Sequence, residues 1–377
     1  MIGIGYLLAL DVSFSAWFLY LVVKALHVLT AVLGISEGGG GNTIANRAPF
    51  IREQGAGAFL GIALFSIWTA RRSLAEVWRE VRRPTGRDRD EVMGFRTAVI
   101  GGGAGLVFLV GFLALAGLPV GVAILFVVIY TLFSLTLARI VSEAGAGWAW
   151  APSWSPTIMT MDSVGANTLG AKNLTLLMGY TSWTSDMRDN PLPQQAQSAK
   201  LGGLAGVPLR AFLGPLVWAS WFGVLCAFWA HLDLYYTYGA ATAKVRPALQ
   251  NGATGPFRQA SSLILTPTYL DSPGLAAAGF GASVAAGLSL LRQHLSHWPL
   301  HPLGYALATT NSMEYMWFPF FLAWLAKRIT LRYGGIQAYR DALPFFLGLI
   351  LGDYVVPSLW GVFGMATGYQ QYMSFPH

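Results

Sequence analysis

Residues 119–142 read PVGVAILFVVIYTLFSLTLARIVS, and this stretch decides the class of fold. It carries no charged side chain before Arg139. A helix needs about 20 mainly apolar residues to cross the hydrocarbon core of a bilayer, and a chain inside that core must satisfy its backbone polar groups internally. The stretch therefore predicts a membrane-spanning α-helix.

The composition of the whole chain extends this prediction. Of 377 residues, 54% are hydrophobic and 11% are charged, and the mean hydropathy is +0.51, whereas about a quarter of the residues in soluble domains are charged. We expect an all-α, polytopic integral membrane helix bundle formed by one transmembrane domain, residues 1–377, in a bacterial inner membrane. The lipid bilayer is its first expected partner. The net charge of +7 does not indicate nucleic-acid binding, because the positive residues lie in short loops between apolar segments. There they indicate how the chain is oriented across the membrane.

A window of membrane-spanning length finds about nine candidate spans, among which broken or re-entrant helices are allowed. They are residues 8–34, 55–74, 94–117, 119–142, 157–183, 208–231, 274–292, 303–327 and 343–366. The fifth contains Asp162 and Lys172 together with two asparagines, and it is too polar to face lipid. It is either buried within the bundle or not a simple span.

A basic segment, residues 78–96, indicates the orientation. Its core, REVRRPTGRDRDE at 79–91, follows the second candidate span and carries a cluster of arginines. Positive residues favour the cytoplasmic side, so we expect this loop to be cytoplasmic. Alternation over an odd number of spans then puts the C-terminal YMSFPH, residues 372–377, on the opposite face. A re-entrant fifth segment would invert every later assignment.

Glycine is frequent, with 44 residues, and three glycine-rich stretches lie inside the candidate spans. They are GGGAG (101–105), GFGASVAAG (279–287) and GLILGD (348–353). Small residues let helices approach closely in lipid, so we expect these stretches to pack against neighbouring helices. SEGGGGNT, residues 36–43, follows the first span and indicates a flexible loop.

Motifs for zinc-dependent catalysis and nucleotide binding are missing from the sequence. It contains no H-E-x-x-H and no G-x-x-x-x-G-K loop. We therefore expect no enzymatic activity and no cofactor, and we expect any transport to be driven by an ion gradient. The single cysteine, Cys226, lies in an apolar segment, so this chain alone can build no disulfide framework.

Histidines are weak candidates for ligands. His27 and His231 lie in or at the ends of spans and could ligate haem or chlorophyll, although a membrane histidine is more often a hydrogen-bonded packing residue. His294, His297 and His301 could share a helical face that binds zinc or copper. Two prolines interrupt that face and no carboxylate or cysteine lies nearby in the sequence, so a loop with titratable histidines is the favoured interpretation.

Ionisable residues inside spans are functional hypotheses by default. Arg139 and Glu143 are one helical turn apart and can form either a structural ion pair or a gate or proton-coupling group. The stretch EAGAGWAWAPSW (143–154) combines glycines, proline and tryptophans and predicts a helix break, which is a favourable place for a site. For the tryptophans alone, an aromatic belt at the membrane interface is the favoured interpretation. Further candidates for binding substrate or carrying protons are Asp162, Lys172, Glu314 and Asp353.

SAKLGGLAGVPLRAFLGP, residues 198–215, places Lys200, Gly202, Pro208 and Arg210 at the start of a long apolar run. This pattern resembles the K-x-G…P-x-R segment of the oligopeptide transporter superfamily, which includes the metal-chelate (yellow-stripe-like) transporters. Spacing alone favours cations that anchor a helix end in the membrane interface. The resemblance implies instead a bend that directs both cations toward a substrate path.

A second stretch carries the same resemblance. Residues 318–353, FPFFLAWLAKRITLRYGGIQAYRDALPFFLGLILGD, are similar to the superfamily's late helix, basic loop and glycine-rich helix. EAGAGWAW (143–150) and WPLHPLGYALA (298–308) resemble segments of uncharacterised bacterial relatives. The resemblance covers roughly residues 130–370, corresponds mainly to the C-terminal half of the superfamily, and implies about sixteen helices in two related halves with a substrate path between them.

The chain supplies about nine such helices and shows no obvious internal repeat. We therefore expect a partner membrane subunit or a homo-oligomer to complete it. The resemblance implies a secondary transporter, or half of one, that moves a small polar solute or peptide together with protons. The alternative is a non-transporting structural subunit of a larger membrane complex, one containing pigment or electron carriers.

Overall fold

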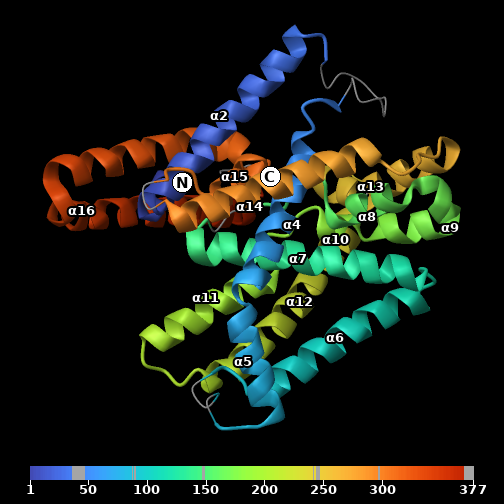
Figure 1. The fold of residues 1–377 in the computed structure, drawn as a ribbon, viewed down its shortest axis with the longest axis horizontal. Helices are drawn as coiled ribbons and strands as arrows, with labels where there is room; N and C mark the ends of the chain where they lie inside the picture. Colours follow the sequence, from blue (N-terminus) through green and yellow to red (C-terminus); the bar gives the residue numbers. More distant parts are fainter. Residues whose placement is uncertain are drawn as a thin grey trace. The chain divides into compact units, whose positions relative to one another are not determined.

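The computed structural model describes residues 1–35, 47–86, 88, 91–146, 149–240, 242, 247–295 and 298–368. Within these residues the chain is all-helical and contains no strand (Figure 1). The predicted all-α class is therefore confirmed for the described chain. The glycine-rich 36–43 stretch and the C-terminal 372–377 stretch lie outside the described residues.

The chain folds as two compact units, each built from separate parts of the sequence. Unit 1 comprises Met1–Ala58, Arg139–Pro152 and Ala278–His377, and unit 2 comprises Phe59–Ala138 and Ser153–Ala277. Helices of unit 1 are α1 (Ile2–Leu7), α2 (Leu10–Val32), α15 (Pro302–Ala308) and α16 (Ser312–Thr367), with the first part of α4 (Ile51–Thr69), the end of α7 (Val120–Ala144) and most of α14 (Ser272–His294). Unit 2 holds the rest of α4, α7 and α14 with α5 (Arg71–Arg82), α6 (Phe95–Leu115), α8 (Pro156–Val164), α9 (Ala166–Gly179), α10 (Thr181–Thr184), α11 (Pro191–Leu204), α12 (Arg210–Tyr238) and α13 (Pro247–Leu265).

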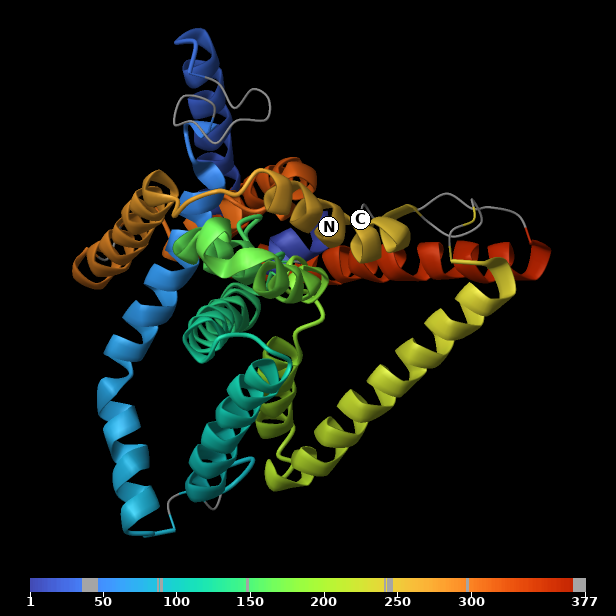
Figure 2. The same cartoon turned by 90° about the vertical axis from the view of Figure 1, so that its right-hand side faces the viewer.

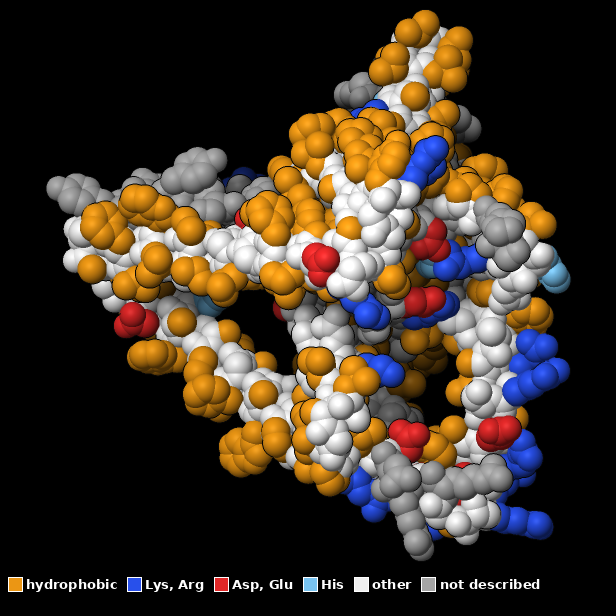
Figure 3. All heavy atoms as spheres, turned by 90° about the vertical axis from the view of Figure 1, so that its left-hand side faces the viewer, with side chains coloured by type: hydrophobic (Ala, Val, Ile, Leu, Met, Phe, Trp, Pro, Cys, Tyr) orange, Lys and Arg blue, Asp and Glu red, His pale blue; other side chains and the backbone are white. Residues whose placement is uncertain are grey.

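Six described helices are long and apolar enough to cross a membrane. They are α2, α6, α7, α12, α14 and α16. The candidate span at α12 starts one residue before the helix, at Leu209. Hydrophobic side chains cover much of the helical surface in Figure 3, whereas lysine and arginine side chains gather along α5. The chain is thus an integral membrane protein, but the expected count of nine spans is not confirmed.

Helix α16 accounts for part of this difference. It contains Gly335, whose φ of 63° and ψ of −161° are not helical, and the helix turns back there (Figure 1). Glycine tolerates a positive φ because it has no Cβ. The last two candidate spans therefore belong to one helical element with two arms, 312–334 and 336–367, and residues 303–308 of the eighth candidate span fall in the separate helix α15.

The fifth candidate span is not a single helix. Residues 157–183 divide among α8, α9 and α10, with Gly165 at a φ of 89° between α8 and α9 and Gly170 at a φ of 70° within α9. Short helices of this kind do not reach across a hydrocarbon core of about 30 Å. This segment is therefore not among the helices long enough to span, and the orientation of the later spans stays a prediction.

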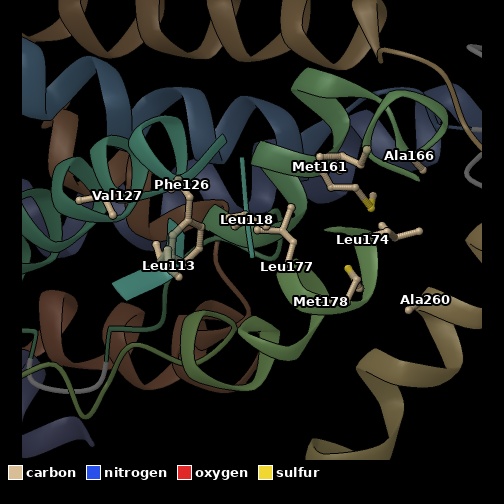
Figure 4. Close-up of a cluster of buried hydrophobic side chains, with 12 residues drawn as sticks. Leu113, Leu118, Phe126, Val127, Met161, Ala166, Leu174, Leu177, Met178 and Ala260 are labelled. Atoms are coloured by element: carbon tan, nitrogen blue, oxygen red, sulfur yellow. The ribbon is translucent and has the colours of Figure 1, made fainter. Parts of the chain in front are cut away.

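The core of unit 2 joins α6 and α7 to these short helices. Figure 4 shows Leu113, Phe126, Leu177 and Met178 among the buried side chains of this cluster, which extends to Ala260 on α13. Between helices in lipid, close van der Waals packing rather than removal from water stabilises such a cluster. Because α8 and α9 contribute much of this cluster, the short helices are held by packing rather than by their own length.

The glycine-rich stretches pack less than expected. A Cβ added at Gly281 on α14 would lie 2.0 Å from the Gln54 backbone oxygen on α4. A Cβ added at Gly57 on α4 would lie 1.9 Å from the Ala278 backbone oxygen on α14, so the two helices meet backbone to backbone. The expectation is confirmed there. It is wrong for GGGAG (101–105) and for the glycines of GLILGD, since an added Cβ at these positions would meet no described atom within 4 Å.

Candidate functional site

Two broken helical pairs in unit 1 form the candidate site. The short α1 precedes the long α2, and the short α15 precedes the long α16. Helix α1 packs against α16 while α15 packs against α2, and the two long helices also contact each other. Each short helix thus lies on the long helix of the other pair. We call this arrangement the crossed hairpins.

The sequences of the two short helices correspond. GYLLA, residues 5–9, matches GYALA, residues 304–308. An added Cβ at Gly5 would lie 2.8 Å from the Ala323 Cβ on α16, and one at Gly304 would lie 2.4 Å from the Ser15 Cβ on α2, so both glycines permit the crossing contact. Inspection of the sequence alone missed this repeat, because five residues stand out only once the contacts pair them.

Ser15 connects the two pairs through hydrogen bonds. Its Oγ donates to the Asp11 carbonyl oxygen at 2.5 Å and accepts the His301 backbone N–H at 2.7 Å. His301 is the N-cap of α15, and its Nδ1 accepts the Leu303 backbone N–H at 3.1 Å. The start of α15 is therefore fixed to α2.

Charged groups surround His301. Arg292 on α14 forms an ion pair with Asp11 on α2. His301 itself is only 4% exposed. Burial lowers the pKa of His301 to about 4 and the cations Arg292 and Arg139 act in the same direction, while the carboxylates Asp11 and Glu143 partly oppose the shift. The imidazole is therefore neutral at neutral pH.

Lys327 on α16 lies in the interior of the same unit. Lys327 is 8% exposed. Its Nζ donates to the Leu8 carbonyl oxygen at 2.7 Å, in the break between α1 and α2. The ammonium also lies 4.9 Å from the centroid of the Tyr339 ring. Within the described residues no carboxylate forms a salt bridge with it. A buried cation of this kind in a membrane protein is a functional hypothesis.

The break between α15 and α16 is also held by a hydrogen bond. The Trp150 backbone N–H donates to the Ser312 Oγ at 2.9 Å. Trp150 belongs to the stretch 143–154, whose predicted helix break is confirmed by the end of α7 at Ala144.

Residues 1–376 match the family of unknown function DUF6785. The chain belongs to this family. No curated protein and no solved structure matches it.

Arg139 and Glu143 pair in the DUF6785 chain as their spacing predicts. The Arg139 Nε donates to Glu143 Oε2 at 2.8 Å. Glu314 accepts from Lys24 at 3.3 Å, and Asp353 pairs with the Met1 amino group. All of these residues lie in unit 1, but whether any of them gates or carries protons stays a prediction.

The K-x-G…P-x-R residues of the transporter resemblance lie in unit 2, on α11, on α12 and in the turn between them, whereas the second resembling stretch, 318–353, lies on α16 in unit 1. Gly202 is buried, and an added Cβ there would lie 2.3 Å from the Phe212 ring, which explains the close approach of α11 to α12. Arg210 donates to the Asp88 carbonyl oxygen at 3.1 Å. Lys200 and Pro208 are exposed, and the crossed hairpins involve none of these four residues.

Asp162 and Lys172 have different surroundings although they belong to one candidate span. Asp162 lies near the end of α8, where its Oδ2 accepts the Trp154 Nε1–H at 2.7 Å and its backbone oxygen accepts the Asp271 N–H at 2.9 Å. Lys172 is exposed on α9. The structure does not bring this pair together through a salt bridge within the described residues.

The predicted histidine ligands are dispersed. His27 Nδ1 lies 2.9 Å from the Val23 carbonyl oxygen, and His231 Nδ1 lies 2.9 Å from that of Ala227, so each bonds within its own helix. His294 is exposed in the last turn of α14, and His297 lies outside the described residues. Among the residues described, no group of three or more histidine, cysteine, aspartate or glutamate side chains could hold a metal ion.

Proposed function

We propose that this DUF6785 chain is a secondary transporter, or half of one, that is related to the oligopeptide transporter superfamily and moves a small polar solute or peptide together with protons. The observation that carries the proposal is the crossed hairpins. Unusually short hydrophobic segments in corresponding positions of two repeated halves are a sequence pointer to a transporter's binding site. GYLLA (5–9) and GYALA (304–308) are two similar short segments, each followed by a break and a long helix.

The chemistry of the crossed hairpins supports this proposal. Non-helical backbone at membrane depth is tolerated where it is buried in protein or lines a water-filled cavity. Here the Leu8 carbonyl group is held by Lys327, and the Asp11 carboxylate is held by Arg292. Lys327 would attract the carboxylate of a peptide or other anionic group as a point charge, and its bond to Leu8 would break as the solute binds.

Uptake by reconstituted protein tests this proposal. Proteoliposomes containing an entrapped pH indicator are given an inward proton gradient and a panel of di- and tripeptides and small polar solutes. We expect at least one solute to increase proton entry, and we expect Lys327→Met to abolish that increase. Arg328→Met is the matched control, because Arg328 is the next residue but is exposed and lies over the Trp324 ring. Equal proton entry with Lys327→Met and the wild type would contradict the assigned role of Lys327.

A second candidate function, a structural subunit of a larger membrane complex, is favoured by α12. This helix of 29 residues has no buried residue, and beyond its start, where Phe212 meets α11, Figure 2 shows it standing apart from the other helices of its unit. Such a face requires lipid or a partner helix to cover it. Native mass spectrometry of the gently extracted protein distinguishes the two candidates: a stoichiometric second chain and visible absorption by a bound pigment support the subunit, whereas their absence together with uptake supports the transporter.

A further inference from the structure

The N-cap of α15 depends on the protonation state of one side chain. The His301 Nδ1 accepts the Leu303 N–H at 3.1 Å. An imidazole nitrogen accepts a hydrogen bond only through its lone pair, and the imidazolium form has no lone pair on either nitrogen. The cap therefore exists only while Nδ1 is unprotonated. This requirement is independent of any pKa.

Helix α15 is placed so that its cap matters. All of its residues, Pro302–Ala308, are buried. Gly304 lies directly against Ser15 of α2, and the Tyr305 hydroxyl lies 3.3 Å from Gln54 Oε1 on α4. With seven residues, α15 cannot be stable on its own propensity, because isolated helices shorter than about 12–15 residues are marginal. Its position therefore depends on its caps and its packing.

We infer that His301 is the proton-responsive cap of α15: a proton taken up from water onto Nδ1 forms a new N–H bond, removes the acceptor of the Leu303 N–H, and loosens the first turn of α15. This step is the proton-coupling event of the proposed transporter, and its role in coupling rests on that proposed function. The cap itself does not.

The charges that face His301 fix the direction of the change. They come from three elements: Asp11 on α2, Arg292 on α14, and Arg139 with Glu143 on α7. Because burial and Arg292 lower the pKa of His301 from 6.5 to about 4, the described state binds this proton roughly 300-fold more weakly than an ordinary imidazole does. Protonation consequently shifts the population toward a state in which His301 is solvated. In that state imidazolium competes with Arg292 for Asp11.

Hydrogen exchange of the purified protein in nanodiscs tests the cap. Exchange of the 303–308 amides is followed from about pH 7.5 to about pH 4 and is corrected for the intrinsic pH dependence of exchange. His301→Asn is the matched variant, because asparagine keeps a side-chain acceptor at the N-cap but does not titrate. We expect wild-type protection to fall at least about tenfold across this range, His301→Asn to stay protected throughout, and His301→Ala to be unprotected already at neutral pH.

Parallel loss of protection in the wild type and in His301→Asn would show that another group titrates, and it would overturn the inference. Arg292→Gln provides a second measurement that needs no change at position 301. Without the Arg292 cation, Asp11 is left to favour the charged form of His301, so the pH at which the 303–308 amides lose their protection should rise. An unchanged midpoint of this exchange transition would also overturn the inference. If the exchange transition appears but no variant transports any solute in the panel, the proposed function fails while the cap stands.

Discussion

Single residues explain how this chain keeps polar groups inside apolar helices. Ser15, His301 and Lys327 each bond to backbone groups at or beside a helix break, so the breaks and the polar side chains satisfy each other. A buried polar group without a partner costs about 1–3 kcal/mol. Each of these residues is therefore expected to affect stability as well as function.

Lys327→Met should destabilise the fold by about 1–3 kcal/mol, because the Leu8 carbonyl loses the donor at 2.7 Å. Lys327→Arg should recover part of this loss, since guanidinium also donates to a carbonyl. Thermal unfolding in detergent measures both variants. A melting temperature of Lys327→Met equal to that of the control Arg328→Met would show that the buried hydrogen bond contributes nothing measurable.

Stability should also depend on pH through His301. Its folded-state pKa of about 4 lies below the ordinary value of 6.5, because burial and Arg292 disfavour the charged form. The unfolded chain therefore binds the proton first as pH falls. The corresponding stability is fully present above about pH 6.5 and is lost progressively down to about pH 4, up to about 3 kcal/mol. Unfolding midpoints of the wild type that match those of His301→Asn at every pH would contradict this assignment.

Residue pairs were predictable from sequence only where they are local. Arg139 and Glu143 meet because a helix brings residues four positions apart together. Asp11 meets Arg292, and Lys327 meets Leu8, through the crossing of helices whose residues lie near opposite ends of the chain. No spacing rule reports such contacts. This is why the candidate residues named from sequence did not include Asp11, Arg292 or Lys327.

At the scale of helices, hydropathy windows predicted correctly the helices whose apolar runs are uninterrupted. The runs of α2, α6, α7, α12 and α14 are continuous and apolar, and each became one long helix. Windows failed where glycine and polar residues interrupt a run, at Gly165 and Gly170. They also failed to detect that Gly335 joins two arms into one element. Hydropathy averages over residues, whereas a break depends on the φ of a single residue.

Glycine substitutions should distinguish packed helix faces from open ones. Gly281→Ala puts a methyl group 2.0 Å from the Gln54 backbone oxygen, so α4 and α14 must separate, and we expect a loss of at least about 1–3 kcal/mol. Gly287→Ala is the matched control on the same helix, because an added Cβ there would meet no described atom within 4 Å. We expect that variant to be neutral or slightly stabilised, since alanine favours helix by up to about 1 kcal/mol. Equal melting temperatures would refute the close crossing.

At the scale of the molecule, the two units differ in what they contribute. Unit 1 contains the crossed hairpins, and unit 2 contains the short helices α8–α10 and the α12 helix without a buried residue. Composition predicted the membrane class because it sums over all residues. Composition could not predict the division into units, because each unit is assembled from segments far apart in the sequence.

The described helices change the expected orientation of the C-terminal region. After the arginine-rich loop come α6, α7, α12, α14 and the two arms of α16; if each of these crosses the membrane and α8–α10 do not, the number of crossings is even. The loop and the end of α16 should therefore face the same side of the membrane.

Thr85→Cys and Thr367→Cys in a Cys226→Ser background test this with a membrane-impermeant maleimide, since both threonines are exposed. We expect both cysteines to react from the cytoplasmic side, where the positive residues of α5 favour the loop. Labelling of the two positions from opposite sides would mean that the segment 157–183 crosses the bilayer despite its breaks at Gly165 and Gly170, and it would restore the odd count that hydropathy predicts.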